Sequence, residues 1–278
     1  MIFVTDKGRM ANNIFQYGQL YAWGREHGRK TMSMRFAYKY PDFKIAHTRY
    51  HNFLIYALAK CAAKLHLIPT VNFDGQERGQ IEMMKSHQHV LVTGWSVRFH
   101  NLFLKYKHEI ISLFDFSPKI HHKVALSMQQ SAKSTVKLGV HIRRGDYATW
   151  CGGRFFFDDS QYINCIQQFI QLQQGQSVDV YICSNDSNLD KQEYQDLLSD
   201  CTISFPSGSP AEDLCLLSEC DYIMGPVSTF TLIASMYHNT PLYWMDNLKQ
   251  PLCLDVFHPF DYQAQHYDEY FIQKTYRR

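Results

Sequence analysis

The stretch LGVHIRRGDY, residues 138–147, joins a buried strand to a group of charged side chains. Its first five residues are apolar apart from His141, as a strand in a parallel sheet covered on both faces requires. His141, Arg143, Arg144 and Asp146 lie within six residues of one another. Ligands of open α/β sheets bind outside the carboxyl ends of the strands. The stretch therefore predicts an α/β fold with a ligand site directly after this strand.

Strands and helices alternate on both sides of this stretch. After it we expect helices at 159–173, 210–220 and 228–238, and strands at 178–184, 201–206, 221–225 and 241–245. Before it we expect strands at 2–5, 31–36 and 89–94, and helices at 12–28, 52–67 and 119–130. In the helix expected at 52–67, apolar residues recur at helical spacing: Leu54, Leu58, Cys61 and Leu65. The alternation predicts parallel sheets with right-handed crossovers, and the polar stretch 129–137 is the candidate linker between two domains, 1–130 and 131–278.

Composition excludes some classes of protein. The chain has 278 residues, 45% of them hydrophobic, which is enough for a large core. Its 28 basic and 26 acidic residues nearly balance, which argues against a nucleic-acid binder. The eight cysteines form no C-x-x-C pair, so we expect reduced thiols and no metal site. The longest apolar stretch, 53–69, is too short and too charged to span a bilayer, and no leader is visible, so a cytoplasmic location is expected.

The side chains after the central strand suit an anionic ligand. His141 and Arg143 share one face of an extended chain. An arginine forms bidentate hydrogen bonds to phosphate oxygens and would stabilise the charge that develops on a departing diphosphate. The alternative is structural: Arg144 and Asp146 form an ion pair that only braces a turn.

A second candidate phosphate site is GPVSTFTLIASM, residues 225–236. Ser228 and Thr229 open a helix there, and a helix N-terminus offers unpaired N–H groups and the positive end of the dipole. The alternative is ordinary N-capping by Ser228 or Thr229.

Two asparagine-rich loops complete the set of candidates. In the loop 8–18, Asn12 and Asn13 either cap a helix or reach a ligand. Asn185 and Asp186 follow the strand VDVYICS, where they either accept hydrogen bonds from a purine base or ribose or form an Asx turn. The chain contains no phosphate-binding glycine motif and no D-x-D metal clamp, so a cationic protein site would have to neutralise a diphosphate.

These motifs together resemble a known family. HIRRGDY resembles the H-x-R-R-G-D-Y signature of the α-1,2-fucosyltransferases, glycosyltransferase family 11. Three further segments look like family segments in the same order: GRMANNIFQY, VYICSND and AEDLCLLSECDYIMGPVSTF. The similarity extends over residues 8–245.

The resemblance implies a GT-B fold, with two Rossmann-like domains that face a cleft. It implies acceptor binding by residues 1–130, GDP-sugar binding by residues 131–278, and a C-terminal tail that packs back. It further implies inverting transfer of fucose from GDP-fucose without a metal or other cofactor. The implied acceptor is an oligosaccharide or glycolipid, and the implied product is an α-1,2 link to a galactose hydroxyl. Such an acceptor is compatible with peripheral contact to a membrane. Nucleic-acid binding is not expected.

Individual roles follow from the aligned motifs. Arg143 matches the arginine that contacts the donor diphosphate, with His141 as its partner. The remaining donor contacts implied are Asn12, Asn185, Asp186, Ser228, Thr229 and Phe230. Three proton acceptors stay open: Asp146, His141 and a donor phosphate oxygen.

The sequence also departs from the family pattern. Arg9, Ala11 and Asn13 replace Gly, Gly and Gln, and TLIAS replaces the common S-W-W-G-A after S-T-F. These changes concern the acceptor more than the donor. The alternatives to a fucosyltransferase are a transferase for another nucleotide sugar and a non-catalytic nucleotide- or glycan-binding protein of the same fold.

Overall fold

The computed structural model describes residues 1–278 except 34–35, 75–78, 130–134, 247 and 273–278. The chain forms two compact units, Met1–Pro118 and Lys119–Arg278. The division precedes the helix expected at 119–130, so that helix belongs with the second unit. Most of the candidate linker 129–137 lies outside the described residues.

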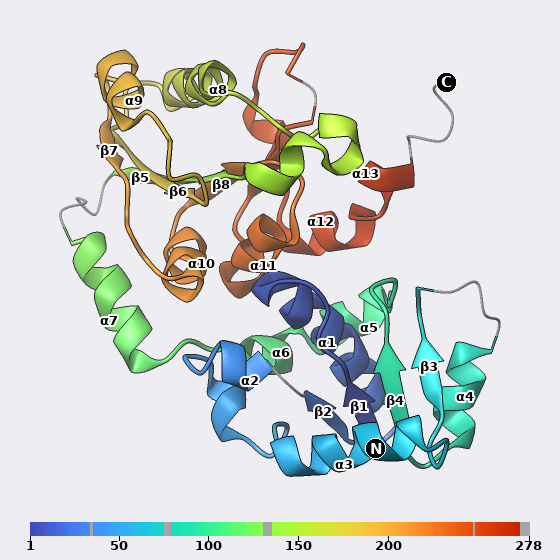
Figure 1. The fold of residues 1–278 in the computed structure, drawn as a ribbon. Helices are drawn as coiled ribbons and strands as arrows, with labels where there is room; N and C mark the ends of the chain where they lie inside the picture. The colour runs from blue at the N-terminus through green and yellow to red at the C-terminus, as the bar shows by residue number, and fades with distance from the viewer. Residues whose placement is uncertain (34–35, 75–78, 130–134, 247, 273–278) are drawn as a thin grey trace. The chain divides into compact units, whose positions relative to one another are not determined.

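Unit 1 is built on a parallel sheet with the strand order β2-β1-β4-β3 (Figure 1). Its strands are β1 (Ile2–Val4), β2 (Thr31–Ser33), β3 (Thr70–Asn72) and β4 (Val90–Thr93). Residue Ile2 lies opposite Thr31 on one side and Val90 on the other. The first, second and fourth of these strands were expected, whereas β3 was missed, since only its middle residue, Val71, is buried.

The helices of unit 1 surround this sheet. They are α1 (Met10–Glu26), α2 (Phe36–Lys39), α3 (Phe53–Lys64), α4 (Gln80–Ser86), α5 (His100–Lys105) and α6 (Lys107–Leu113), with a 3₁₀ turn at Lys44–His47. Helix α1 is buried over most of its surface, including the polar residues Asn13, Gln16 and Gln19. The side-chain oxygen of Gln19 accepts a hydrogen bond from the Phe99 backbone N–H at 2.6 Å, which satisfies part of this buried polarity.

Helix α3 buries the face opposite to the apolar one that its sequence predicts to be inside. The repeating residues Leu54, Leu58 and Leu65 are exposed to solvent, and so is Cys61. The helix instead buries Tyr56, Ala59 and Ala63, which pack with Phe3, Met32 and Leu91. One tyrosine and two alanines thus face the sheet, and the leucines face outward.

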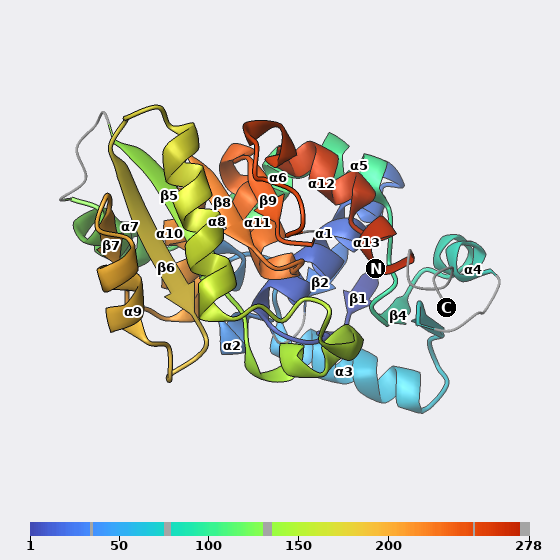
Figure 2. The ribbon, with the colours of Figure 1, turned by 90° about the horizontal axis from the view of Figure 1, so that it is seen from above.

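Unit 2 contains a parallel sheet of five strands in the order β7-β6-β5-β8-β9. The strands are β5 (Val136–Ile142), β6 (Val178–Ser184), β7 (Thr202–Ser204), β8 (Tyr222–Gly225) and β9 (Leu242–Trp244), and Figure 2 shows them from above. The central strand β5 carries the sequence LGVHI, with His141 opposite Cys183 of β6. The expected α/β fold is therefore confirmed for the segment that predicted it.

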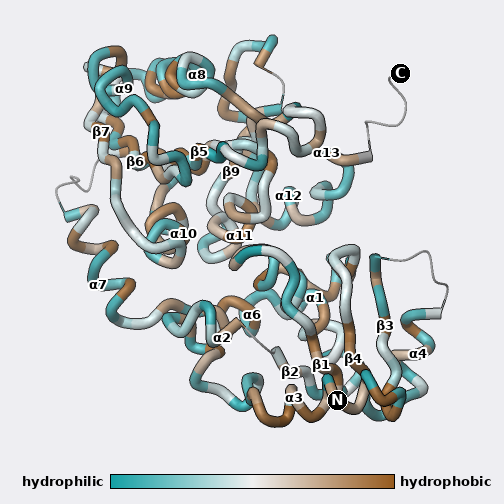
Figure 3. The backbone as a smooth tube through the Cα atoms, in the orientation of Figure 1, coloured by the Kyte–Doolittle hydropathy of each residue, from teal (hydrophilic) through white to brown (hydrophobic). Residues whose placement is uncertain are grey.

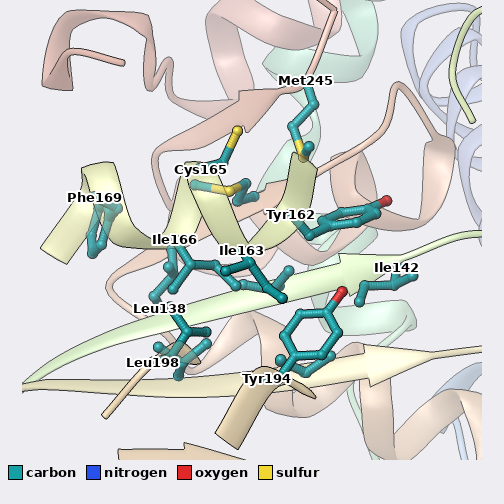
Figure 4. Packing of buried hydrophobic residues seen from close by; sticks show 14 of the residues in the cluster. Leu138, Ile142, Tyr162, Ile163, Cys165, Ile166, Phe169, Tyr194, Leu198 and Met245 are labelled. Atoms are coloured by element: carbon teal, nitrogen blue, oxygen red, sulfur yellow. The ribbon is translucent and has the colours of Figure 1, made fainter. Parts of the chain in front are cut away.

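Helices cover both faces of this second sheet (Figure 1). One layer contains α8 (Asp159–Leu172) and α9 (Lys191–Leu197), and the other contains α10 (Pro210–Ser218) and α11 (Thr229–His238). Helix α7 (Pro118–Ser127) precedes the sheet. Figure 4 shows the core between α8 and the strands, where Tyr162, Ile163 and Ile166 pack near Leu138 and Ile142. Because β5 is covered on both faces, its near-continuous apolar sequence is explained.

The strand order places a topological switch point between β5 and β8. The chain runs from β5 outward to β6 and β7, then returns to the other side of β5 to form β8 and β9. HIRRGDY begins with the last two residues of β5 and the S-T-F segment follows β8, so both leave the sheet at this switch point. Open α/β sheets bind their ligands at such a point.

The residues after β9 pack onto unit 2. Helix α12 (Phe260–His266) contacts α11, and the Gln263 side chain donates to the Leu242 carbonyl at 2.9 Å. A last short helix, α13 (Glu269–Ile272), brings the Tyr270 ring to 4.8 Å from that of Trp244. None of the eight cysteines, all of which are described, forms a disulfide. Within the described residues, no helix has the length and apolar character needed to cross a bilayer.

Candidate active site

His141 lies at the end of β5 as a buried, neutral side chain. It is 6% exposed, and its ring stacks on Phe230 with the centroids 4.6 Å apart. Burial, followed by the charge of Arg143, lowers the pKa of His141 to about 3. Its Nδ1 atom has no hydrogen-bond partner among the described residues. The imidazole is therefore uncharged at neutral pH.

Gly225 makes room for this histidine. A Cβ atom at position 225 would lie 2.8 Å from the backbone oxygen of His141 and 3.3 Å from its Cβ. Strand β8 can approach β5 at this point only because residue 225 has no side chain. The glycine of the GPVSTF segment thus has a packing role that its position before a proline did not reveal.

Arg143 directly follows β5 and forms an ion pair at the carboxyl end of this strand. Its Nη2 atom lies 2.6 Å from Oδ1 of Asp146, and its guanidinium carbon is 5.3 Å from the centroid of the Tyr147 ring. The Arg143 side chain is 13% exposed, whereas the Asp146 side chain is 55% exposed. The guanidinium is held in place by a carboxylate that remains open to solvent.

Arg144 has a different set of partners from the one expected. Its guanidinium lies 2.6 Å from Asp159 and 3.2 Å from Asp186, and all three side chains are largely buried. The alternative interpretation paired Arg144 with Asp146, and this is wrong, because Asp146 pairs with Arg143. The physical reason is that adjacent residues of an extended chain point in opposite directions. Arg144 thus braces the fold and leaves Arg143 as the arginine at the carboxyl edge.

Asn185 and Asp186 hold the loop after β5. The Asn185 side chain accepts from the Arg144 backbone N–H at 2.9 Å and donates to the Arg144 carbonyl at 3.4 Å. Asp186 accepts from the backbone N–H of Asn188 at 2.9 Å, which is the Asx turn considered as an alternative. The structure therefore places both residues beside the HIRRGDY loop and gives each a structural partner. Their contact with a base remains a prediction.

The S-T-F segment forms the N-terminus of α11. Ser228 is the N-cap, and its hydroxyl accepts hydrogen bonds from the backbone N–H groups of Phe230 and Thr231 at 3.0 and 3.4 Å. The N-capping alternative is thus confirmed for Ser228, whereas Thr229 is the first residue of the helix. Capping and anion binding are compatible, because the positive end of the dipole stays at the same place.

Tyr147 connects the two phosphate-binding candidates. Its buried hydroxyl donates a hydrogen bond to the Val227 carbonyl at 3.0 Å. Burial raises the pKa of Tyr147 above its ordinary value, so the hydroxyl remains a donor throughout the physiological range. The final tyrosine of HIRRGDY therefore ties the loop that carries Arg143 to the residues that begin α11.

Asn12 and Asn13 belong to unit 1 and neither is a helix cap. Helix α1 begins at Met10 with Arg9 as N-cap, which puts both asparagines inside the first turns. Asn13 is buried and braces the preceding loop, accepting from the Lys7 N–H at 2.7 Å and donating to the Arg9 carbonyl at 2.9 Å. The N-cap interpretation is wrong because the helix starts two residues earlier than its apolar pattern. Asn12 is the half-buried member of the pair.

Asp213 is a candidate that the sequence analysis missed. It lies in the first turn of α10, and its carboxyl hydrogen-bonds with the thiol of Cys183 near the end of β6. Burial, followed by the charge of Glu212, raises the pKa of Asp213 to about 7. Its Oδ1 atom is buried without a hydrogen-bond partner among the described residues. The only sequence signal was an acid in the first turn of a helix, which is too common to single out.

One group of side chains in the described part of unit 2 has the chemistry of a metal site. Potential ligand atoms of His121, Cys215 and Glu219 lie within 4.8 Å of one another. The group belongs to α7 and α10 and includes none of the candidate site residues. Arg143 and the N-terminus of α11, by contrast, both lie at the switch point, and each can bind an anion directly.

Two compact units, each built on a parallel sheet of the Rossmann type, form the architecture of the GT-B class of glycosyltransferases. Structural comparison supports this fold. The Arabidopsis thaliana protein FUT1, solved as a mutant in complex with GDP, is similar with a TM-score of 0.63 and 11% identity over 93% of this chain and 72% of that one. POFUT1 in complex with GDP-fucose is similar with a TM-score of 0.58 and 12% identity, over 86% and 93% of the two chains. The NodZ α-1,6-fucosyltransferase of Bradyrhizobium, soaked with GDP-fucose, gives 0.53 and 13%, over 88% and 94%.

Sequence comparison identifies the family. Residues 1–240 match the model of glycosyl transferase family 11, and no curated protein matches the chain in sequence. The chain belongs to glycosyl transferase family 11. The resemblance of its HIRRGDY motif to the fucosyltransferases of that family is thereby confirmed.

Proposed function

We propose that this protein transfers fucose from GDP-fucose to a glycan hydroxyl, forming an α-1,2 link to galactose, with inversion and without a metal ion. Family membership supports glycosyl transfer. The structural neighbours solved with GDP or GDP-fucose support the choice of donor. The absence of a D-x-D motif supports neutralisation of the diphosphate by protein groups.

One observation carries the proposal. Arg143 and the N-terminus of α11 leave neighbouring strands at the switch point, and Tyr147 joins them through its 3.0 Å hydrogen bond to Val227. A diphosphate bound here would receive hydrogen bonds from the guanidinium and favourable interaction with the helix dipole. Negative charge grows on this diphosphate as the bond to fucose breaks. Both groups therefore stabilise the transition state more than the bound substrate.

The guanine base is assigned to the edge formed by the ends of β6 and the start of α10. Asp213 lies there with its buried Oδ1 atom unpaired, and in its ionised form the carboxylate would accept hydrogen bonds from the N1–H and the amino group of guanine. Adenine offers an acceptor at N1, which would repel the carboxylate. Asn185 and Asp186 adjoin the same edge and would position the base or the ribose. The contact of Asn12 with the donor, which the resemblance implies, stays a prediction.

The acceptor hydroxyl needs a proton acceptor, and Asp146 is the better placed of the two side chains considered. Its carboxylate is 55% exposed, so a sugar can reach it. His141 is 6% exposed, and its lowered pKa makes the imidazole a weak base. We assign His141 to holding Phe230 and the start of α11, and Asp146 to orienting Arg143 and receiving the proton.

The test is a screen of galactose-terminated and other glycan acceptors with GDP-fucose, with the linkage of the product read by NMR. An α-1,2-fucosylated product that forms equally well in EDTA supports the whole proposal. Thermal-shift measurements with GDP, UDP and ADP identify the nucleotide, and stabilisation by UDP alone would point to a different donor. GDP binding without transfer or donor hydrolysis would instead indicate a non-catalytic protein of this fold.

A further inference from the structure

The outer face of α3 exposes an unusual amount of apolar surface. Leu54, Leu58 and Leu65 are 74%, 71% and 68% exposed, and Leu67, just after the helix, is 74% exposed. Phe53 and Ile55 add partly exposed side chains at the start of the helix. Figure 3 shows this hydrophobic run along α3 and the residues after it. Single exposed leucines are ordinary, but a contiguous group of this kind marks an interaction surface.

The exposure follows from the way the helix packs. Its inner face uses Tyr56, Ala59 and Ala63 against the sheet, and the two alanines contribute little apolar area. The leucines at positions 54, 58 and 65 continue one stripe at helical spacing on the opposite side. A helix stabilised only by its own core would carry the large residues inside. The outward stripe is therefore free of contacts with the described core of unit 1 and is available to a partner.

The charged residues in the stretch of sequence that contains α3 are all of one sign. From residue 43 to residue 73 the sequence contains no Asp or Glu, while it contains Lys44, Arg49, Lys60 and Lys64 and three histidines. Lys60 and Lys64 are exposed on α3 itself. Neither lysine forms an ion pair within the described residues. Long lysine side chains can extend from an apolar surface toward charged head groups.

We propose that the outer face of α3, comprising Phe53, Leu54, Ile55, Leu58, Leu65 and Leu67, docks unit 1 onto an anionic lipid bilayer. Interfacial helices have this combination of a leucine-rich face and basic flanks, and they lie in the plane of the membrane. The 12-residue helix has a length of about 18 Å, too short to cross the hydrocarbon layer. A second copy of the chain fits less well, because a symmetric contact would bring Lys60 and Lys64 of both copies together.

The proposal goes beyond fucosyl transfer and does not depend on it. The protein would partition between water and the bilayer surface, and two separable contributions would determine this equilibrium. Apolar burial depends on the leucines and resists salt, whereas attraction to anionic head groups depends on the lysines and weakens with salt. Each lysine near the surface is expected to change binding about fivefold.

The experiment is flotation of the purified full-length protein with vesicles of phosphatidylcholine alone or with 30% phosphatidylglycerol, roughly the anionic content that produces a strong surface potential. We expect binding to the anionic vesicles only. Leu54→Ser with Leu58→Ser should lower binding at least tenfold at any salt concentration. Lys60→Glu with Lys64→Glu should lower it about as much at low salt. The matched control changes two exposed leucines of unit 2, Leu126→Ser and Leu197→Ser, and should leave binding unchanged.

Thermal unfolding and sedimentation of every variant separate this proposal from misfolding and self-association. The α3 variants should unfold near the wild-type temperature, since only exposed side chains are replaced. Wild-type protein that fails to bind anionic vesicles, or an α3 double variant that binds them as well as wild type, overturns the proposal. A dimer that dissociates on Leu54→Ser with Leu58→Ser, together with absent vesicle binding, would show that a second copy covers this face.

Discussion

Replacing Arg143 by alanine isolates the group on which the proposed chemistry depends. The substitution removes a guanidinium that is held by Asp146 at 2.6 Å and lies over the Tyr147 ring at 5.3 Å. Because Asp146 is 55% exposed, its lost ion pair should cost only about 0–1 kcal/mol. The lost cation–π contact adds about 0.5–1 kcal/mol. The sum is well below the usual stability of about 5–15 kcal/mol, so the variant should fold.

The catalytic loss should be larger. A unit charge about 4 Å from a growing negative charge contributes about 4 kcal/mol at an effective dielectric constant of about 20. Removing a positioned donor of this kind costs about 3–4 kcal/mol in measured enzymes, which is 10²–10³-fold in rate. We therefore expect kcat and kcat/KM for Arg143→Ala to fall together by about 10²–10³, since the interaction belongs to the transition state. Arg143→Lys keeps the charge without the bidentate geometry and should fall in between.

The assay is release of GDP from GDP-fucose in the presence of an acceptor, with the free energy of unfolding measured in parallel. The control is Arg25→Ala in unit 1, which also removes a carboxylate-paired arginine, here bonded to Glu109 at 2.8 Å, and should keep full turnover. If folded Arg143→Ala turned over within threefold of wild type, the guanidinium would not be stabilising the leaving group. The electrostatic explanation would then be refuted.

Three further variants test other groups of unit 2. The pKa of Asp213 is about 7 in the folded state and 3.8 as a free side chain, so between these pH values the folded state retains a proton that the unfolded chain has lost. The wild-type protein should therefore lose stability relative to Asp213→Asn as the pH rises from about 4 to 7. Urea unfolding of both proteins at pH 5 and pH 8 measures this difference. The same variant should weaken GDP binding by calorimetry, and unchanged affinity would exclude Asp213 from the base site. Gly225→Ala places a Cβ 2.8 Å from the His141 carbonyl oxygen and should destabilise the fold by about 1–3 kcal/mol, whereas wild-type stability would mean that the strands can separate there. Tyr147→Phe leaves the Val227 carbonyl without its donor and should lower the free energy of unfolding by about 1–2 kcal/mol, with a larger fall in kcat than in GDP affinity.

The structural neighbours bear on the fold, and the family match bears on the chemistry. The identities of 11–13% establish only that the chain shares its architecture with FUT1, POFUT1 and NodZ. The match over residues 1–240 makes it a member of glycosyl transferase family 11. The donor nucleotide, the sugar and the linkage are then distinguished by the screens described above.

The amino-acid sequence by itself determined the class of fold and the position of the candidate site in the chain. The strands β5 and β6 were predicted because a strand buried on both faces needs a continuous apolar run, and this requirement is local. The motif HIRRGDY was predicted as a ligand site because charged residues directly after such a strand must emerge at its carboxyl end. The capping role of Ser228 was considered for the same reason, since an N-cap depends on only three or four neighbouring residues.

The tertiary structure alone decided how these residues are paired. Arg143 with Asp146 and Arg144 with Asp159 and Asp186 could not be assigned from sequence, because the choice depends on which strand and helix lie beside β5. The burial that raises the pKa of Asp213 and the outward orientation of the α3 leucines have the same origin. Helical spacing defines a stripe of apolar residues but not the direction in which that stripe points. Only packing against the rest of the chain determines which face of a helix is inside and which carboxylate meets which arginine.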